Sequence, residues 1–346
     1  MGDNKTIDRQ SNIELLRIIA MFAILFGHFI GYGYGDIADI QETYKITINQ
    51  SILAFLTIHV NLFLLITGYF GIRLRWASFI RLFVKCTFYA IGIYAIWALV
   101  TNQSMHLAVI LKRCLFFCRT SPWWFIENYF YLMLFSPLLN ICIKGLDKTR
   151  YKKILLLLAF INLVLGGFLK SSLNVTGFTI HHFVFIYFIG GYIRRYGLFE
   201  NVGSKILLLV YILCVSFIFA GFASGYEVVR GYINPFVLLG SMVVFCLFLR
   251  VKFRSRAINW IASSSLAVYL LHDDDTIIRY IYRERMHDLY NFTSEPYFYL
   301  PLTFLSAVLF FCCAILIDKL VGKLLLPLTK FLAEYDVMMM ISKRIN

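Results

Sequence analysis

Apolar residues recur along this chain in runs of about 17–25 positions, separated by short polar stretches. A helix of that length crosses the ~30 Å hydrocarbon layer of a bilayer. The pattern predicts an all-α polytopic membrane bundle that forms one integral-membrane domain over residues 1–346. The expected spans are approximately 12–31, 50–71, 79–101, 124–143, 153–170, 180–197, 204–222, 231–249, 257–273 and 298–320.

The composition agrees with a membrane protein. Of 346 residues, 60 % are hydrophobic and only 15 % are charged, whereas soluble domains carry about 25 % charged residues. The first apolar run contains Arg17 and is followed by no small-residue cleavage site. We therefore expect a retained helix rather than a signal peptide.

The net charge of +14 follows the expected topology. If the N-terminus lies inside, the inner loops collect most of the 33 lysines and arginines. Such a bias is typical of cytoplasmic loops. It predicts cytoplasmic N- and C-termini and a lipid bilayer as the environment, and it argues against a nucleic-acid partner.

Arg17 and His28 stand eleven residues apart within the first run. At about 100° per residue they share one helix face, ~16 Å apart along the axis, and Glu14 can pair with Arg17 one turn earlier. Charged groups inside a membrane are costly and often functional. Arg17 can alternatively snorkel to inner head groups, and His28 can be an interfacial histidine bonded to a carbonyl.

The second run ends in Thr67-Gly68-Tyr69, where Gly68 permits another backbone to approach closely. Inner arginines follow at positions 73, 75 and 81. Guanidinium groups bind phosphate oxygens bidentately, although the topological bias alone also explains these arginines.

The fourth run opens with Trp123 and Trp124, which suit either an interfacial aromatic belt or a substrate wall. Glu127 lies one turn inside, flanked at helical spacing by Asn128 and Tyr131. A carboxylate at that depth must face protein or water. It is either a structural partner for a basic residue or an acid–base group.

His272, late in the chain, falls at the same depth as His28 and precedes three aspartates, 273–275. These groups can form a proton-transfer site with a carboxylate orienting the base, a cation-binding mouth, or a solvated loop. The longest polar stretches are 101–123 and 273–297, with an amphipathic interfacial helix expected at 105–118. Cys114, Cys118 and His106 lack a fourth ligand, so we expect no metal site.

Five segments, in order, resemble the acyltransferase type-three family of bacterial inner-membrane proteins. They are NIELLRIIAMFAILFGHF with its Arg17-x10-His28 motif, ITGYFGIR, PWWFIENYFYLMLFSPLLN, FIYFIGGYIRRYG and SSSLAVYLLHDDD. The resemblance implies transfer of an acyl group, usually acetyl from acetyl-CoA, to a hydroxyl of a surface or lipid-linked glycan. It also implies location in the bacterial cytoplasmic membrane, no permanently bound cofactor, and polysaccharide-assembly proteins as partners.

The resemblance links His28 to acyl transfer, makes Arg17 its motif partner, and matches His272 to a late Tyr-x-x-His. Thr67 replaces the usual serine of a Ser-Gly-Tyr motif, and Glu127 does not match the spacing of a glutamate motif found in some branches. The expected site combines three groups of residues. They are His28, His272 and Glu127 as catalytic residues; Arg17, Arg73, Arg75 and Arg81 at the donor; and Tyr69, Thr67, Trp124 and Tyr131 along the substrate.

The expected depths of Arg17 and His28 in the membrane suggest a mechanism, because acetyl-CoA reaches the protein from the cytoplasm. Its phosphates would meet Arg17 and the inner arginines, and its pantetheine arm, on the order of 15–20 Å, would follow the ~16 Å helix rise to His28. His28 then acts as general base or accepts the acyl group itself. A glycan-precursor transporter or flippase, and a non-catalytic partner in polysaccharide assembly, remain alternatives.

Overall fold

The computed structural model describes residues 9–34, 43–115, 123–169, 176–224, 231–293 and 295–332, which form helices and no strands. The helices of the first half are α1 (Ser11–Tyr34), α2 (Thr43–Leu56), α3 (His59–Phe70), α4 (Trp76–Val100), α5 (Leu107–Leu115), α7 (Trp124–Gly145) and α8 (Lys148–Ala159), which continues as the π-helix η1 (Phe160–Phe168). The second half contains α9 (Ile180–Tyr196), α10 (Ser204–Ala223), α11 (Pro235–Arg250), α12 (Arg256–Ala262), α13 (Ser265–His272), α14 (Asp275–Ile277), the π-helix η3 (Ile278–Arg285), α15 (Met286–Phe292) and α16 (Pro296–Leu324).

Seven helical stretches in the described residues are long and apolar enough to cross a bilayer, and α11 is a shorter apolar helix. The chain is therefore a multi-pass membrane protein. The expected spans 180–197 and 257–273 are also helical, but α9 is short and the second is divided into α12 and α13 at Ser263 and Ser264. The count of ten spans and the cytoplasmic placement of both termini stay predictions.

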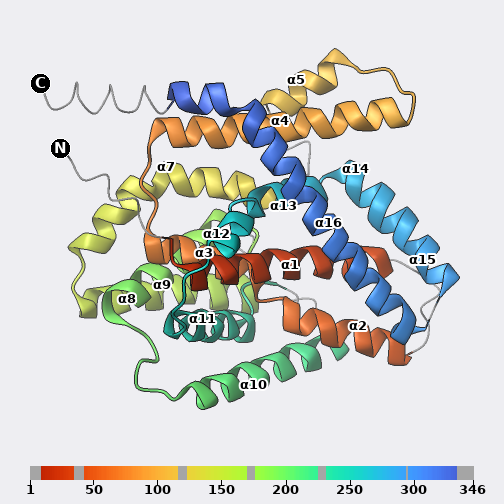
Figure 1. The fold of residues 1–346 in the computed structure, drawn as a ribbon. Helices are drawn as coiled ribbons and strands as arrows, with labels where there is room; N and C mark the ends of the chain where they lie inside the picture. The colour runs from red at the N-terminus through yellow and green to blue at the C-terminus, as the bar shows by residue number, and fades with distance from the viewer. Residues whose placement is uncertain are drawn as a thin grey trace, which may run out of the picture.

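Helix α1 runs through the middle of the bundle (Figure 1). It contacts α2, α3, α11, α12, α13, α15, α16 and η3. Its apolar side chains Leu16, Leu25 and Phe29 are buried in the main hydrophobic core. This central position explains how one helix can carry polar groups through the membrane, because protein surrounds it on most sides.

Helices α3 and α9 cross at backbone contact. A Cβ atom built on Gly190 would lie 2.5 Å from the Leu65 carbonyl oxygen, and one on Gly68 would overlap the carbonyl of Tyr187. The close approach predicted at Gly68 is confirmed. Small residues allow membrane helices to pack this tightly, and the crossing places the Thr67-Gly68-Tyr69 segment inside the bundle.

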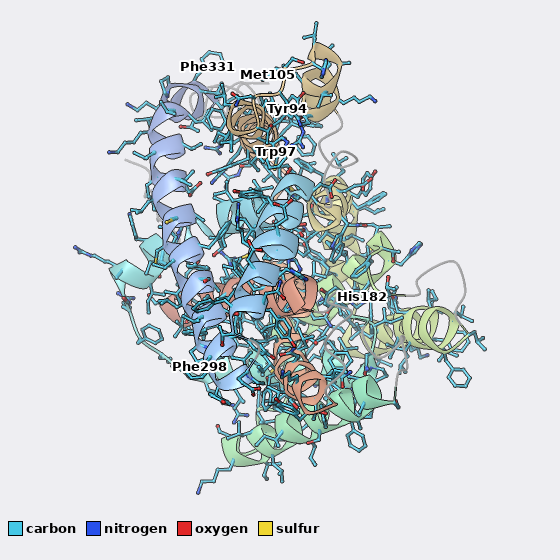
Figure 2. The ribbon with its side chains drawn as sticks, turned by 90° about the vertical axis from the view of Figure 1, so that its right-hand side faces the viewer. Tyr94, Trp97, Met105, His182, Phe298 and Phe331 are labelled. Atoms are coloured by element: carbon cyan, nitrogen blue, oxygen red, sulfur yellow. The ribbon has the colours of Figure 1, made fainter. Side chains whose placement is uncertain are left out.

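Helix α5 confirms the short helix expected within 105–118, as far as the described residues reach. It lies beside the end of α4, where the Tyr94 hydroxyl accepts a hydrogen bond from the His106 backbone N–H at 3.1 Å (Figure 2). By contrast, the polar stretch expected at 273–297 is largely helical. Tyr282, Met286 and Tyr290 are buried there at four-residue spacing. This stretch therefore has a side that faces the core, although its charged residues make the sequence polar on average.

Candidate active site

A cavity of about 470 Å³ extends along α1, between α3, α4, α7, α12 and α13. Arg17 and His28 both line it, as residues on one face of α1 should. Its remaining lining residues are Arg9, Glu14, Met21, Ile24, Val60, Phe63, Thr67, Ser78, Leu82, Trp124, Phe125, Ile126, Tyr129, Met133, Tyr232, Ala262, Ser263, Ser265, Leu266, Tyr269 and Asp273. The cavity therefore connects a basic end, nearer the start of α1, with an end that holds a histidine and a carboxylate.

Polar groups surround Arg17 at the basic end. Its guanidinium lies 3.3 Å from the Glu14 carboxylate, which confirms the pairing expected from their spacing. The Tyr129 hydroxyl interacts with the Thr67 hydroxyl and with the charge of Arg17. About a third of the Arg17 side chain is exposed, so the guanidinium can reach a ligand in the cavity.

The other end contains a compact acid–imidazole group. His28 Nδ1 lies 3.7 Å from Asp273 Oδ1, and the ring centroids of His28 and His272 are 5.1 Å apart. The Asp273 carboxylate also interacts with the Tyr269 hydroxyl. His272 and Asp273 are almost fully buried, whereas the side chain of His28 is 21 % exposed. His28 is therefore the more accessible of the two histidines.

The backbone determines which nitrogen of His272 carries the proton. His272 Nδ1 lies 2.6 Å from the Val268 carbonyl oxygen, and since a carbonyl only accepts, Nδ1 must be the donor. In the neutral ring Nε2 is then an acceptor. No hydrogen-bond partner for it is found in the part of the chain that the structure describes. His272 can accept a proton at Nε2, but in this form it cannot donate to an oxyanion.

The three aspartates after His272 occupy different environments. Asp273 faces His28, whereas Asp274 is fully buried and binds Arg113 of α5 at 3.0 Å. Arg113 also donates to the Ala90 carbonyl of α4 at 2.9 Å, and Asp275 is exposed. No group of three or more candidate metal ligands is found among the described residues. The arrangement matches the proton-transfer interpretation of this segment for Asp273 and a structural ion pair for Asp274.

Several predicted residues lie outside the cavity. Glu127 accepts a hydrogen bond from the exposed Tyr131 hydroxyl at 2.9 Å, and neither residue lines the cavity. Arg73 and Arg75 are exposed. Arg81 donates to Ser78, a lining residue, at 3.3 Å. Thr67 and Trp124 do line the cavity, and Tyr69 lines a neighbouring one.

Sequence reasoning missed four residues in or beside the cavity, of which Tyr129 lies at the basic end beside Arg17. Tyr129, Tyr232 and Tyr269 line the cavity, and His59 interacts electrostatically with His28 and His272. Tyr129 and Tyr269 stand in the motifs quoted above, so polar residues inside apolar runs were the available signal. Tyr232 carried no such signal, because it lies at the beginning of the run 231–249. His59 did carry it, because it is an ionisable residue well inside the run 50–71.

Comparison with known proteins gives a family match. A family model described as an acyltransferase domain matches residues 10–319, nearly the whole chain. No curated protein matches, and no solved structure matches. The matched range includes every residue of the acid–imidazole group and, at the basic end of the cavity, Arg17 and Glu14.

Proposed function

On the premise that this chain belongs to the acyltransferase type-three family, we propose that it transfers an acetyl or other short acyl group from cytoplasmic acyl-CoA to a glycan hydroxyl. The acceptor is a cell-surface or lipid-linked glycan, and the membrane is the bacterial cytoplasmic membrane. One observation carries the proposal. A single cavity joins Arg17, which suits an anionic donor, to His28 and Asp273, which suit proton transfer.

The donor extends along α1. Its phosphates lie towards Arg17, and its thioester reaches His28, about 16 Å further along the helix axis. The apolar wall between the two ends, which includes Met21, Ile24 and Val60, suits the pantetheine arm. A cofactor held permanently is not needed, because the acyl-CoA is consumed at each turnover.

His28 acts as general base. Because its Nδ1 faces Asp273, Nε2 is the nitrogen that we assign to the substrate. It takes the proton of the acceptor hydroxyl, the hydroxyl oxygen attacks the thioester carbonyl, and the carbon–sulfur bond breaks. The proton then passes from Nε2 to the departing thiolate of CoA. General-base assistance of this kind contributes on the order of 10²–10⁴-fold.

The second route begins with attack by His28 Nε2 on the thioester carbonyl, which gives an acyl-histidine and releases CoA. The acceptor hydroxyl then attacks the acyl-histidine and takes the acyl group. This route forms and breaks the same bonds overall and differs only in the intermediate. In either route Asp273 and His272 orient the ring of His28 rather than contact the acyl group. An ionised Asp273 also stabilises the imidazolium that forms during transfer.

The test is His28→Ala in proteoliposomes supplied with labelled acetyl-CoA and in cells assayed for O-acetyl groups on surface glycans. We expect loss of acetyl transfer in both, with unchanged amounts of protein in the membrane. His106→Ala, which removes an exposed histidine outside the cavity, is the matched control and should retain activity. Acetyl transfer at the wild-type rate by His28→Ala would refute the assignment.

Two further readouts separate the remaining alternatives. Single turnovers without acceptor, quenched with denaturant at neutral pH because acyl-imidazoles hydrolyse in acid, should leave label on the protein only if an acyl-histidine forms. Movement of a glycan across the bilayer by the wild-type protein, with acetyl-CoA present and no acetylated product, would indicate a transporter instead.

A further inference from the structure

A second cavity, of about 660 Å³, lies at the basic end of α1. Its lining consists of Arg9, Gln10, Asn12, Tyr69, Leu249, Lys252, Phe253 and Arg254. Arg9 also lines the first cavity. The two cavities are therefore neighbours, and the second lies beyond Arg17 with respect to His28.

Hydrogen bonds hold the basic wall of this second cavity against α1. Ser255, at the end of the wall segment, donates its backbone N–H to the Ser11 hydroxyl at 2.9 Å. Asn12 donates its side-chain amide to the Phe248 carbonyl at 2.8 Å. Segment 249–255 thus has a defined position beside the helix that carries Arg17 and His28, so the two cavities keep a fixed relation.

The lining has a distinctive chemistry. It contributes three cations, Arg9, Lys252 and Arg254, and no acidic side chain. It also contributes the aromatic rings of Tyr69 and Phe253. Arginine and lysine bind phosphate oxygens, and aromatic rings stack on nucleobases. The size lies within the range of about 300–1,000 Å³ that is typical of small-molecule sites.

Two observations argue against the plain positive-inside bias as a full explanation. Arg250, in the same basic stretch, is directed elsewhere, to the Ser204 hydroxyl at 2.9 Å and the Phe199 carbonyl at 2.6 Å. Lys252 and Arg254 instead share one cavity with Arg9, which is 245 positions away from Arg254 along the chain. The topological bias raises the number of basic residues in a loop, but it does not direct them into one cavity with two aromatic rings.

We propose that this second cavity holds the phosphorylated nucleoside end of the acyl-CoA donor, with Arg9, Lys252 and Arg254 on the phosphates and Tyr69 or Phe253 against the adenine. The inference rests on the proposed function and extends it, because it places the nucleotide beyond Arg17. The exposed Arg73 and Arg75 are then not the main phosphate ligands. Arg9, common to both cavities, marks the point where the pantetheine arm enters the first.

Phosphate can also reach this region as the head group of an anionic lipid. The experiment therefore compares two donors and two membranes. The variant is the double substitution Lys252→Gln and Arg254→Gln. The matched control is Lys152→Gln with Lys153→Gln, two exposed lysines of α8 that lie outside both cavities. The donors are acetyl-CoA and acetyl-pantetheine, which lacks every phosphate.

In nanodiscs of neutral phosphatidylcholine, the variant should raise the KM for acetyl-CoA about tenfold or more, as expected for loss of two charge-assisted phosphate contacts. The preference of the wild-type protein for acetyl-CoA over acetyl-pantetheine should shrink accordingly. Adenosine 3′,5′-bisphosphate should inhibit the wild-type protein and the lysine control competitively, and the variant much less.

An unchanged KM for acetyl-CoA in the variant overturns the inference. So does an effect that appears only in nanodiscs containing phosphatidylglycerol, which would indicate a lipid head-group site. If the wild-type protein transfers acetyl from neither donor, the proposed function fails while the inference is still decided by equilibrium binding of adenosine 3′,5′-bisphosphate. Binding that the variant weakens supports a nucleotide site, and binding that it leaves unchanged, or no binding, overturns it.

Discussion

Gly190→Ala tests the contact between α3 and α9 that positions one wall of the cavity. The added Cβ would lie 2.5 Å from the Leu65 carbonyl oxygen and 2.6 Å from the Tyr69 backbone nitrogen. Non-bonded heavy atoms prefer about 3.5–4.0 Å, so the helices must separate by roughly 1 Å. Overpacking of this kind costs about 1–3 kcal/mol. Backbone atoms on the opposing helix cannot rotate away, so we expect the upper part of that range.

The measurement is thermal unfolding in detergent, together with acetyl transfer at a temperature where the variant remains folded. Gly92→Ala in α4 is the matched control, because its Cβ would meet no atom within 4 Å. Alanine is favoured over glycine in a helix by roughly 1 kcal/mol, so this control should be neutral or slightly stabilised. Because the preference for alanine applies equally to Gly190 inside α9, the two variants should differ in stability by the overpacking cost alone, about 1–3 kcal/mol.

A third variant should have an intermediate stability. Gly191→Ala would place its Cβ 2.7 Å from the Tyr151 hydroxyl and 3.2 Å from a methyl group of Ile143. Those atoms lie at the ends of side chains, so they can move more easily than backbone. We expect its stability to fall between those of Gly190→Ala and Gly92→Ala. If Gly190→Ala melts at or above Gly92→Ala, the proposed backbone contact is wrong.

Two further predictions concern the reactive end. Arg113→Met removes the cation from the buried Asp274 and should lower the free energy of unfolding by about 3–5 kcal/mol. The control is Arg150→Met, at the exposed ion pair with Asp147 on α8, which should change the melting temperature little. Equal melting temperatures of the two variants would contradict the assignment of a buried ion pair. His272→Phe keeps a ring beside His28 but loses the bond to the Val268 carbonyl, so kcat should fall while the KM for acetyl-CoA stays near the wild-type value. A rise in KM alone would show that His272 acts on the donor rather than on His28.

The expected helices follow from run length, because ~30 Å of hydrocarbon requires about 20 apolar residues. Local interruptions do not follow from it. Ser263 and Ser264 separate α12 from α13, yet serine is also common within packed membrane helices. The helical stretch 275–292 was missed for a different reason. Its charged residues lower the average hydropathy, whereas its core-facing side carries Tyr282, Met286 and Tyr290, which are buried at four-residue spacing.

The candidate site also has a part that follows from local sequence and a part that does not. Arg17, Glu14 and His28 belong to one helix, so 3.6-residue periodicity fixes their relative directions before any tertiary contact is known. Arg113 and Asp274 lie 161 positions apart. Their contact depends on how α5 packs against α4 and on where α13 ends, and neither follows from the local pattern of either segment. Lys252 and Arg254 line one cavity with Arg9 for the same reason, because hydrogen bonds join their segment to the distant start of α1.

The end of α13 shows why the sequence places acidic residues beside His272 but does not predict which partner each carboxylate faces. His272 is the last helical residue, and its ring nitrogen bonds the carbonyl of Val268 one turn earlier. Asp273 has φ −104° and ψ 34°, outside helical geometry. Consecutive side chains therefore diverge, Asp273 to His28 and Asp274 to Arg113. Had the helix continued, its geometry would have separated successive side chains by about 100°, and the directions of both carboxylates would have been set by α13 alone. Because α13 ends at His272, the turn after the helix, rather than helical periodicity, sets the direction in which Asp273 meets His28 and Asp274 meets Arg113.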